Sequence, residues 1–116
     1  MDPEGVRVGM NDARFREANE RIERRAIPTD VELVPFVCEC ADRDCVQLVL
    51  LTVREYESVR SDPVHFLNVP GHQASAGPFA RVVSRHPRYV VVEKLGDAAL
   101  VAERLDPRDR SGEDVA

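Results

Sequence analysis

The residues of this sequence best suited to chemistry are its three cysteines, which all lie within a stretch of eight residues. Cys38, Cys40 and Cys45 have the spacing Cys-x-Cys-x4-Cys. Thiolate sulfurs gathered by a turn suit a tetrahedral Zn²⁺ ion, with Zn–S distances of about 2.3 Å. The Ala-Asp-Arg-Asp segment before Cys45 is polar and turn-forming, so it can fold the third sulfur back towards the first two. We therefore predict one zinc ion with three cysteine ligands.

Other interpretations of the cysteines stay open. Three reduced, partly buried thiols need no partner, although unrelated structural cysteines would be expected to scatter along the chain. A structural disulfide is rare in a reducing compartment, and an odd count leaves one thiol unpaired. A Cys38–Cys40 bridge would also close a small, strained ring. A redox role, in which oxidation ejects zinc, needs an exposed and reactive thiolate.

Three cysteines leave one position of a tetrahedral site to fill, and His72 is the predicted fourth ligand. It follows Pro70-Gly71, a turn dipeptide that can present the imidazole from a loop. His86, between two expected strands, is interpreted as a solvated turn residue. Four protein ligands would make a closed structural site, whereas three ligands and a water would make an open site that can catalyse. The alternatives for the fourth position are His65, Asp42, Asp44 or a water molecule.

Motifs beyond the cysteines give the sequence a family resemblance. A Cys-x-Cys-x4-Cys segment, a Thr-x-x-Glu-Tyr-Glu motif, Pro-Gly-His and a Tyr-x-Val-Val-Glu-Lys motif follow one another within residues 36–45, 51–60, 69–72 and 88–94. This order resembles a group of small uncharacterised bacterial proteins over residues 14–107. The resemblance supports His72 as the fourth ligand and implies no reaction. The cysteine spacing alone is similar to the zinc-binding post-SET segment of lysine methyltransferases, in which a fourth ligand comes from elsewhere.

Length and charge limit the class of protein. The 116 residues support one domain, which we place at 11–106 between a flexible segment at 1–10 and a disordered tail at 107–116. With 21 acids against 16 bases the net charge is −5, which argues against a protein that coats nucleic acid. No apolar run reaches the roughly 18 residues of a membrane span. The chain opens without a secretory signal, so we expect a cytoplasmic protein.

The residue pattern predicts an α+β fold in which two strands flank the cysteines. A helix is expected over 11–26, with Phe15, Ala18, Ile22 and Ala26 as its apolar stripe. A second helix is expected over 96–105, with Ala98, Val101, Ala102 and Leu105 facing inward. The other expected elements are an extended segment at 31–38, a strand at 46–51, a helix at 52–60 with a Thr52–Glu55 capping box, an extended segment at 66–69, a flexible loop at 73–77, a strand or helix at 78–85 and a strand at 88–95. The result is a small antiparallel sheet with N-terminal and C-terminal helices and a metal-binding knuckle.

For function, we predict a non-enzymatic regulatory or protein-interaction module with a structural zinc site and an unidentified protein partner. The sequence has no nucleophile elbow, phosphate-binding loop or His-Glu-x-x-His motif. One alternative is a metal-dependent enzyme with an open site, in which Glu39 or an aspartate of the knuckle acts as general base. Another is a nucleic-acid-binding regulator that uses the basic stretch carrying Arg81, Arg85 and Arg88.

Overall fold

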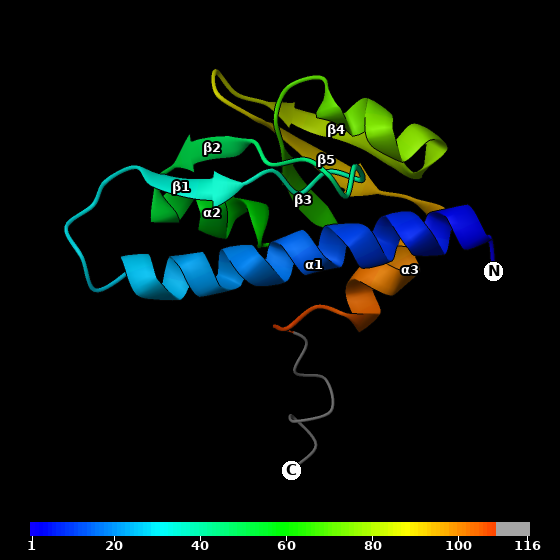
Figure 1. Ribbon diagram of the computed structural model, residues 1–116, viewed down its shortest axis with the longest axis horizontal. Coiled ribbons are helices and arrows are strands. Elements are labelled where there is room, and N and C mark those ends of the chain that lie inside the picture. Colours follow the sequence, from blue (N-terminus) through cyan, green and yellow to red (C-terminus); the bar gives the residue numbers. More distant parts are fainter. Residues whose placement is uncertain (109–116) are drawn as a thin grey trace, which may run out of the picture.

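The computed structural model describes residues 1–108, which form an α+β fold (Figure 1). The elements follow in the order α1, β1, β2, α2, β3, η1, β4, β5 and α3. Along the chain, an N-terminal helix is followed by small antiparallel sheets and then by a C-terminal helix, so the predicted fold class is confirmed. Of the predicted disordered tail, residues 109–116 lie outside the described part of the chain.

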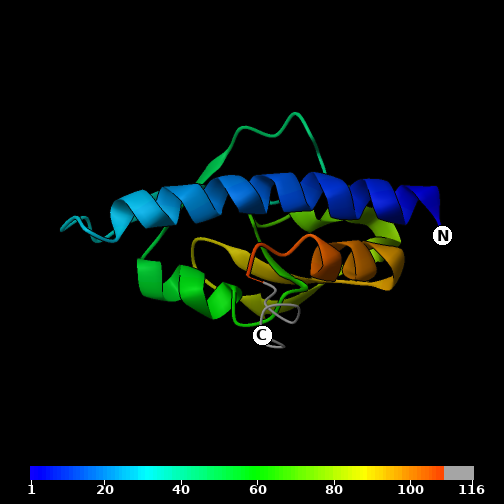
Figure 2. The same ribbon diagram turned by 90° about the horizontal axis from the view of Figure 1, so that it is seen from below.

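Helix α1 (Pro3–Ala26) runs along one whole side of the molecule (Figures 1 and 2). The predicted flexible segment at 1–10 is wrong, because most of it forms the first turns of this helix. Proline is favourable at a helix start, and the side chain of Asp2 caps the first turn. Close packing also holds this end: a Cβ on Gly9 would lie 2.8 Å from the Cβ of Val101.

The strands form two separate antiparallel sheets. Strand β1 (Val34–Val37) pairs with β2 (Leu48–Leu51) as a hairpin, and the three cysteines lie on the connection between them, as predicted. The second sheet has the strand order β3-β5-β4, with β5 in the centre. Its strands are β3 (His65–Asn68), β4 (Ala80–Arg85) and β5 (Val90–Lys94).

The structure also shows how the predictions for the segments between and after the strands turn out. Helix α2 (Val53–Val59) starts with the predicted Thr52–Glu55 capping box. Residues expected to form a flexible loop at 73–77 lie instead in 3-10 helical turns, η1 (His72–Phe79), with a kink at Gly77, and most of the ambiguous segment at 78–85 forms strand β4. Helix α3 (Gly96–Arg104) buries the predicted side chains except Leu105, which follows the helix end and is exposed.

The main apolar core lies between the hairpin, α2 and β3. Phe36 and Tyr56 stack in it with ring centroids 4.3 Å apart, and Leu51 and Leu67 pack around them. Cys38 belongs to the same buried cluster. The hairpin that carries the cysteines is therefore fixed by ordinary hydrophobic packing on one of its faces.

The buried face of α1 is largely polar, although it also includes Val8 and Ala13. The predicted stripe is only partly buried, because the helix turns a different face to the rest of the protein. Arg16 lies on that face and donates to the carbonyls of Pro63 (2.6 Å) and Ala102 (2.7 Å). The other buried polar residues of α1 are Asn11, Asp12, Asn19, Glu20 and Glu23. Among residues 1–108 no helix is long and apolar enough to cross a membrane.

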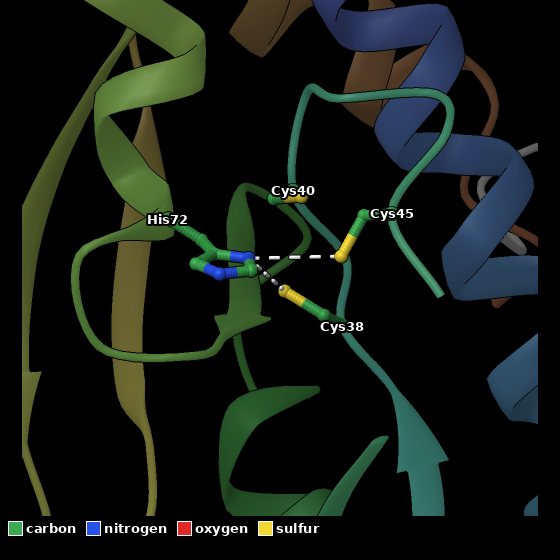
Figure 3. Close-up of side chains that lie close together, drawn as sticks. All are labelled: Cys38, Cys40, Cys45 and His72. Carbon is green, nitrogen blue, oxygen red and sulfur yellow. Dashed lines mark hydrogen bonds between the residues drawn. The ribbon is translucent and has the colours of Figure 1, made fainter. Parts of the chain in front are cut away.

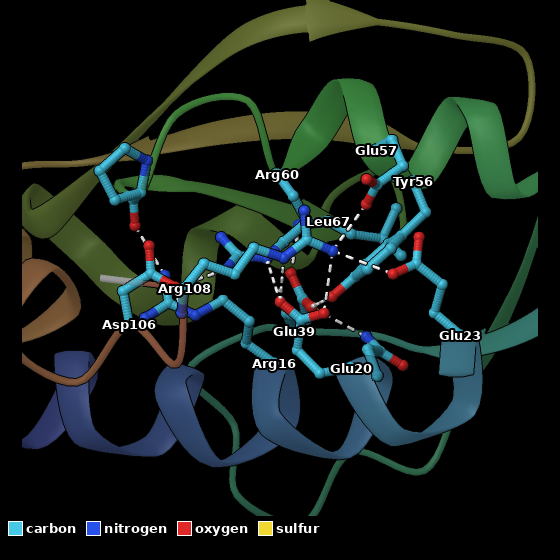
Figure 4. A network of polar contacts seen from close by, with 12 residues as sticks. Arg16, Glu20, Glu23, Glu39, Tyr56, Glu57, Arg60, Leu67, Asp106 and Arg108 are labelled. Carbon is cyan, nitrogen blue, oxygen red and sulfur yellow. Dashed lines mark hydrogen bonds and ion pairs between the residues drawn. The ribbon is translucent and has the colours of Figure 1, made fainter. Parts of the chain in front are cut away.

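An ion-pair network connects the C-terminal half of α1 to the end of α2 and to the segment after α3 (Figure 4). Arg60 pairs with Glu20 (2.8 Å) and with Asp106 (2.5 Å). Arg108 pairs with Glu20 (2.7 Å) and Glu23 (2.9 Å). The sequence predicts that Arg108 lies in a disordered tail at 107–116, but these ion pairs hold it in place. The prediction is wrong for this residue because its acidic partners are far from it in sequence.

Candidate metal centre

The structure brings Cys38, Cys40, Cys45 and His72 together at one site (Figure 3). Their four candidate ligand atoms all lie within 4.8 Å of one another. The Nδ1 atom of His72 is 3.6 Å from the sulfur of Cys38 and 3.6 Å from that of Cys45. Cys38 and Cys40 are buried, whereas Cys45 and His72 are partly exposed. Such a group could hold a metal ion at the edge of the core.

The knuckle, which we define as residues 38–45, is shaped by local hydrogen bonds. The N–H of Cys38 donates to the carbonyl of Gln47 (3.0 Å), which extends the hairpin pairing by one residue pair. The N–H of Cys45 donates to the carbonyl of Asp42 (3.0 Å), and that of Asp44 to the Asp42 carboxylate (2.9 Å). The polar segment therefore forms the predicted turn and returns the third sulfur to the first two.

Glu39 anchors the knuckle to the second sheet. Its N–H donates to the carbonyl of Leu67 (2.7 Å), and its carboxylate accepts from the N–H of Leu67 (2.8 Å). The other carboxylate oxygen accepts from Asn19 of α1 (2.9 Å) and from the Tyr56 hydroxyl (3.3 Å). Burial raises the pKa of Glu39, a change that these hydrogen bonds oppose. The side chain is committed to fixing the backbone between Cys38 and Cys40.

The turn after β3 presents the imidazole. Gly71 has a φ of +93°, a left-handed conformation suited to glycine, and the N–H of His72 donates to the carbonyl of Val69 (2.9 Å). Ser75 of η1 then bridges to the knuckle: its hydroxyl donates to the carbonyl of His72 (2.8 Å) and accepts from the N–H of Ala41 (3.0 Å). The backbone positions of ligands far apart in sequence are thus coupled.

The three thiols differ in pKa. A hydrogen bond with Cys38 lowers the pKa of Cys40 to about 5, and the same bond together with burial raises the pKa of Cys38. Burial also raises the pKa of Cys45. Sulfurs this close do not all ionise on their own, because each thiolate disfavours the next. A divalent cation would stabilise three thiolates together and release their protons.

The two other histidines and the two aspartates of the knuckle do not belong to this group of donors. His65 is near the carboxylates of Asp62 (3.6 Å) and Glu93 (3.7 Å). His86 hydrogen-bonds to Ser84 and stacks on Tyr89. The exposed Asp42 and Asp44 shape the turn of the knuckle. Within residues 1–108, Cys38, Cys40, Cys45 and His72 are the group of His, Cys, Asp and Glu donors close enough to hold a metal.

The arginines of the basic stretch are spread over β4 and the β4–β5 turn. Arg81 lies 3.4 Å from a carboxylate oxygen of Glu93. Arg88 pairs with Glu55 (3.1 Å) and donates to the carbonyl of Leu50 (2.9 Å). Arg85 is exposed. Two of the three predicted nucleic-acid contacts therefore have acidic partners inside the protein.

Side chains of α1 that the sequence analysis missed support the knuckle. The amide of Asn11 donates to the carbonyl of Cys40 (3.0 Å). Asn19 bridges β1 and Glu39: its amide nitrogen donates to the carbonyl of Val37 (2.8 Å) and its oxygen accepts from the N–H of Val37 (2.8 Å). The polar residues at 12, 16, 19, 20 and 23 share one helix face, but this spacing alone is equally typical of a solvated face.

No protein-family model, curated protein or solved structure matches the chain.

Proposed function

We propose that this chain is a non-enzymatic protein-interaction module folded around one zinc ion, which Cys38, Cys40, Cys45 and His72 hold in a closed structural site. The observation that carries the proposal is the convergence of four donors from two segments that are 27 residues apart at their closest. Unrelated cysteines and a surface histidine have no reason to meet in this way.

The donor distances support a tetrahedral ion. With Zn–S near 2.3 Å and Zn–N near 2.0 Å, tetrahedral angles give S···N separations of about 3.5 Å. The two S···N separations at His72 are both 3.6 Å. The N–H of Val69 also donates to the sulfur of Cys38 (3.2 Å), a contact that favours the thiolate. Soft sulfur ligands with one imidazole favour zinc over magnesium or calcium.

Such an ion would join parts of the fold that share no strand ladder. The cysteines follow β1 of the hairpin, and His72 follows β3 of the second sheet. A structural zinc site contributes ~10–16 kcal/mol of apparent binding free energy in small peptides. Domains of this size are stable by only ~5–15 kcal/mol. Scaffold stabilisation is therefore a sufficient role for the metal.

The surroundings of the four donors support a closed site over an open one. Glu39, the general base of the enzymatic alternative, is engaged by Leu67, Asn19 and Tyr56. Thiolate ligands also reduce the Lewis acidity that metal-bound water would need. We extend the proposal to membership of the group of small bacterial proteins whose motifs contain the same four residues, and to a cytoplasmic location, where thiols stay reduced.

The test is the zinc affinity of His72→Ala against a matched control, His86→Ala. One ligand in four represents ~3 kcal/mol of the binding free energy. We expect His72→Ala to bind zinc about 100-fold more weakly or worse, and to unfold at lower temperature. His86→Ala should match the wild type in both. Affinity is measured by competition with a chromophoric chelator.

A second variant keeps the test decisive if His72→Ala does not fold. His72→Cys supplies a fourth soft ligand and should keep stoichiometric zinc. Unchanged zinc affinity in His72→Ala would refute the assignment of the fourth ligand, and protein that binds no zinc in any variant would refute the proposed function.

A further inference from the structure

The β1–β2 hairpin is apolar on both of its faces. Val34, Phe36, Val49 and Leu51 fill the core on the inner face. An antiparallel sheet with a solvated outer face normally alternates apolar and polar side chains. Here the cross-strand pairs Pro35–Leu50 and Val37–Leu48 fall between the buried pairs, so they lie on the opposite face. The outer face of the hairpin consists of Leu33, Pro35, Val37, Val46, Leu48 and Leu50.

This outer face is a large exposed patch. Val46 is 85% exposed, Leu48 60% and Leu50 45%. Together with Leu33 and the adjoining Val31, these residues are five of the eleven exposed large hydrophobic residues in the described chain. We estimate the exposed area at about 500 Å², a size at which patches on soluble proteins often mark an interaction site.

Both edges of the hairpin are already occupied by side chains. Asn19 hydrogen-bonds to the N–H and the carbonyl of Val37 on the β1 edge. Arg88 donates to the carbonyl of Leu50 on the β2 edge. An added strand would compete with these bonds, so a partner is expected to pack on the face rather than extend the sheet.

We propose that a second copy of this chain covers the outer face of the hairpin and forms a twofold dimer. The six side chains of the face carry no charge, so the same patch on two copies can pack together without charge repulsion. Two facing copies would bury about 1,000 Å² of apolar surface, which a polar rim would raise into the range of standard stable interfaces. This dimer rests on the proposed function as a protein-interaction module, and the interaction partner is then a second copy of the chain.

Sedimentation velocity from 1 to 100 µM tests the dimer. We expect the wild type to approach about 26 kDa, twice the 13.0 kDa of one chain. Leu48→Lys/Leu50→Lys should weaken association by about 100-fold or more, because it buries unpaired charge. The control is Leu100→Lys/Leu105→Lys, which changes leucines that are 46% and 49% exposed outside the hairpin. The control should associate like the wild type.

The outcomes separate this inference from the metal site. Zinc content measured on the same samples should be one per chain in every variant, since no substituted leucine is a ligand. A wild type that stays monomeric at 100 µM with full zinc would overturn the proposed dimer. A dimer that forms equally well with the hairpin substitutions would also overturn it. Neither result would contradict the zinc site. If the double variant fails to fold, Val46→Lys, outside the strands, should still weaken association about 10-fold.

Discussion

Replacing Asn19 by leucine, which has the same number of side-chain heavy atoms but no hydrogen-bonding group, should loosen the attachment of α1 to the knuckle. Asn19 is fully buried and makes three hydrogen bonds: two with the backbone of Val37 (both 2.8 Å) and one to the carboxylate of Glu39 (2.9 Å). Leucine can make none of them. The substitution would leave a backbone N–H, a carbonyl and part of a carboxylate unsatisfied in the protein interior.

The magnitude follows from these three bonds. Each buried neutral group left without a partner costs about 1 kcal/mol, and a hydrogen bond to a charged group is worth about 2 kcal/mol. We expect Asn19→Leu to lower the free energy of unfolding by about 3–5 kcal/mol. For a domain of ~100 residues this corresponds to a fall in Tm of roughly 12 °C or more.

The assay is urea unfolding of zinc-saturated protein, with Arg21→Leu as the control on the same helix. Arg21 and its partner Glu17 are both more than half exposed. Removing this pair should therefore change stability by less than about 0.5 kcal/mol. If Asn19→Leu loses less than about 1 kcal/mol, our account of how α1 holds the knuckle is wrong.

Two further predictions concern the packing and charge of α1. Gly9→Ala, which usually stabilises a helix interior by about 1 kcal/mol, should here lower the melting temperature, because the new Cβ would lie 2.8 Å from that of Val101; a higher melting temperature would contradict the close helix contact. Burial raises the pKa of Glu23 from 4.5 to about 7. The folded state then binds more protons than the unfolded state between these values, so stability should fall as pH rises through this window. Glu23→Gln should reduce the change in the free energy of unfolding with pH, measured by unfolding titrations at several pH values. An unchanged pH dependence would contradict the raised pKa of Glu23.

The hairpin, the turn of the knuckle and the turn that precedes His72 could be predicted because their signals are local. The cysteines, the turn-forming residues between Cys40 and Cys45, and the Pro70-Gly71 turn each lie within a few residues of one another. The capping box at Thr52 is equally local. Short-range chemistry of this kind depends little on the rest of the fold.

The orientation of α1 could not be predicted because its partners are distant in sequence. Apolar periodicity pointed to the face that carries Phe15 and Ile22. The face that is actually buried carries charges, which can be buried only where Lys94, Arg60 and Arg108 meet them. Those residues follow the helix by tens of positions, so nothing near it in the sequence reveals them.

The binding of zinc by three sulfurs and one nitrogen is tested most directly by X-ray absorption at the zinc edge, with metal analysis, on protein purified without chelator. We predict one zinc per chain, with three sulfur ligands near 2.3 Å and one nitrogen ligand near 2.0 Å, as expected for a closed site. Protein without stoichiometric zinc, or a spectrum that lacks the outer-shell scattering of an imidazole ring because water replaces His72, would contradict this assignment.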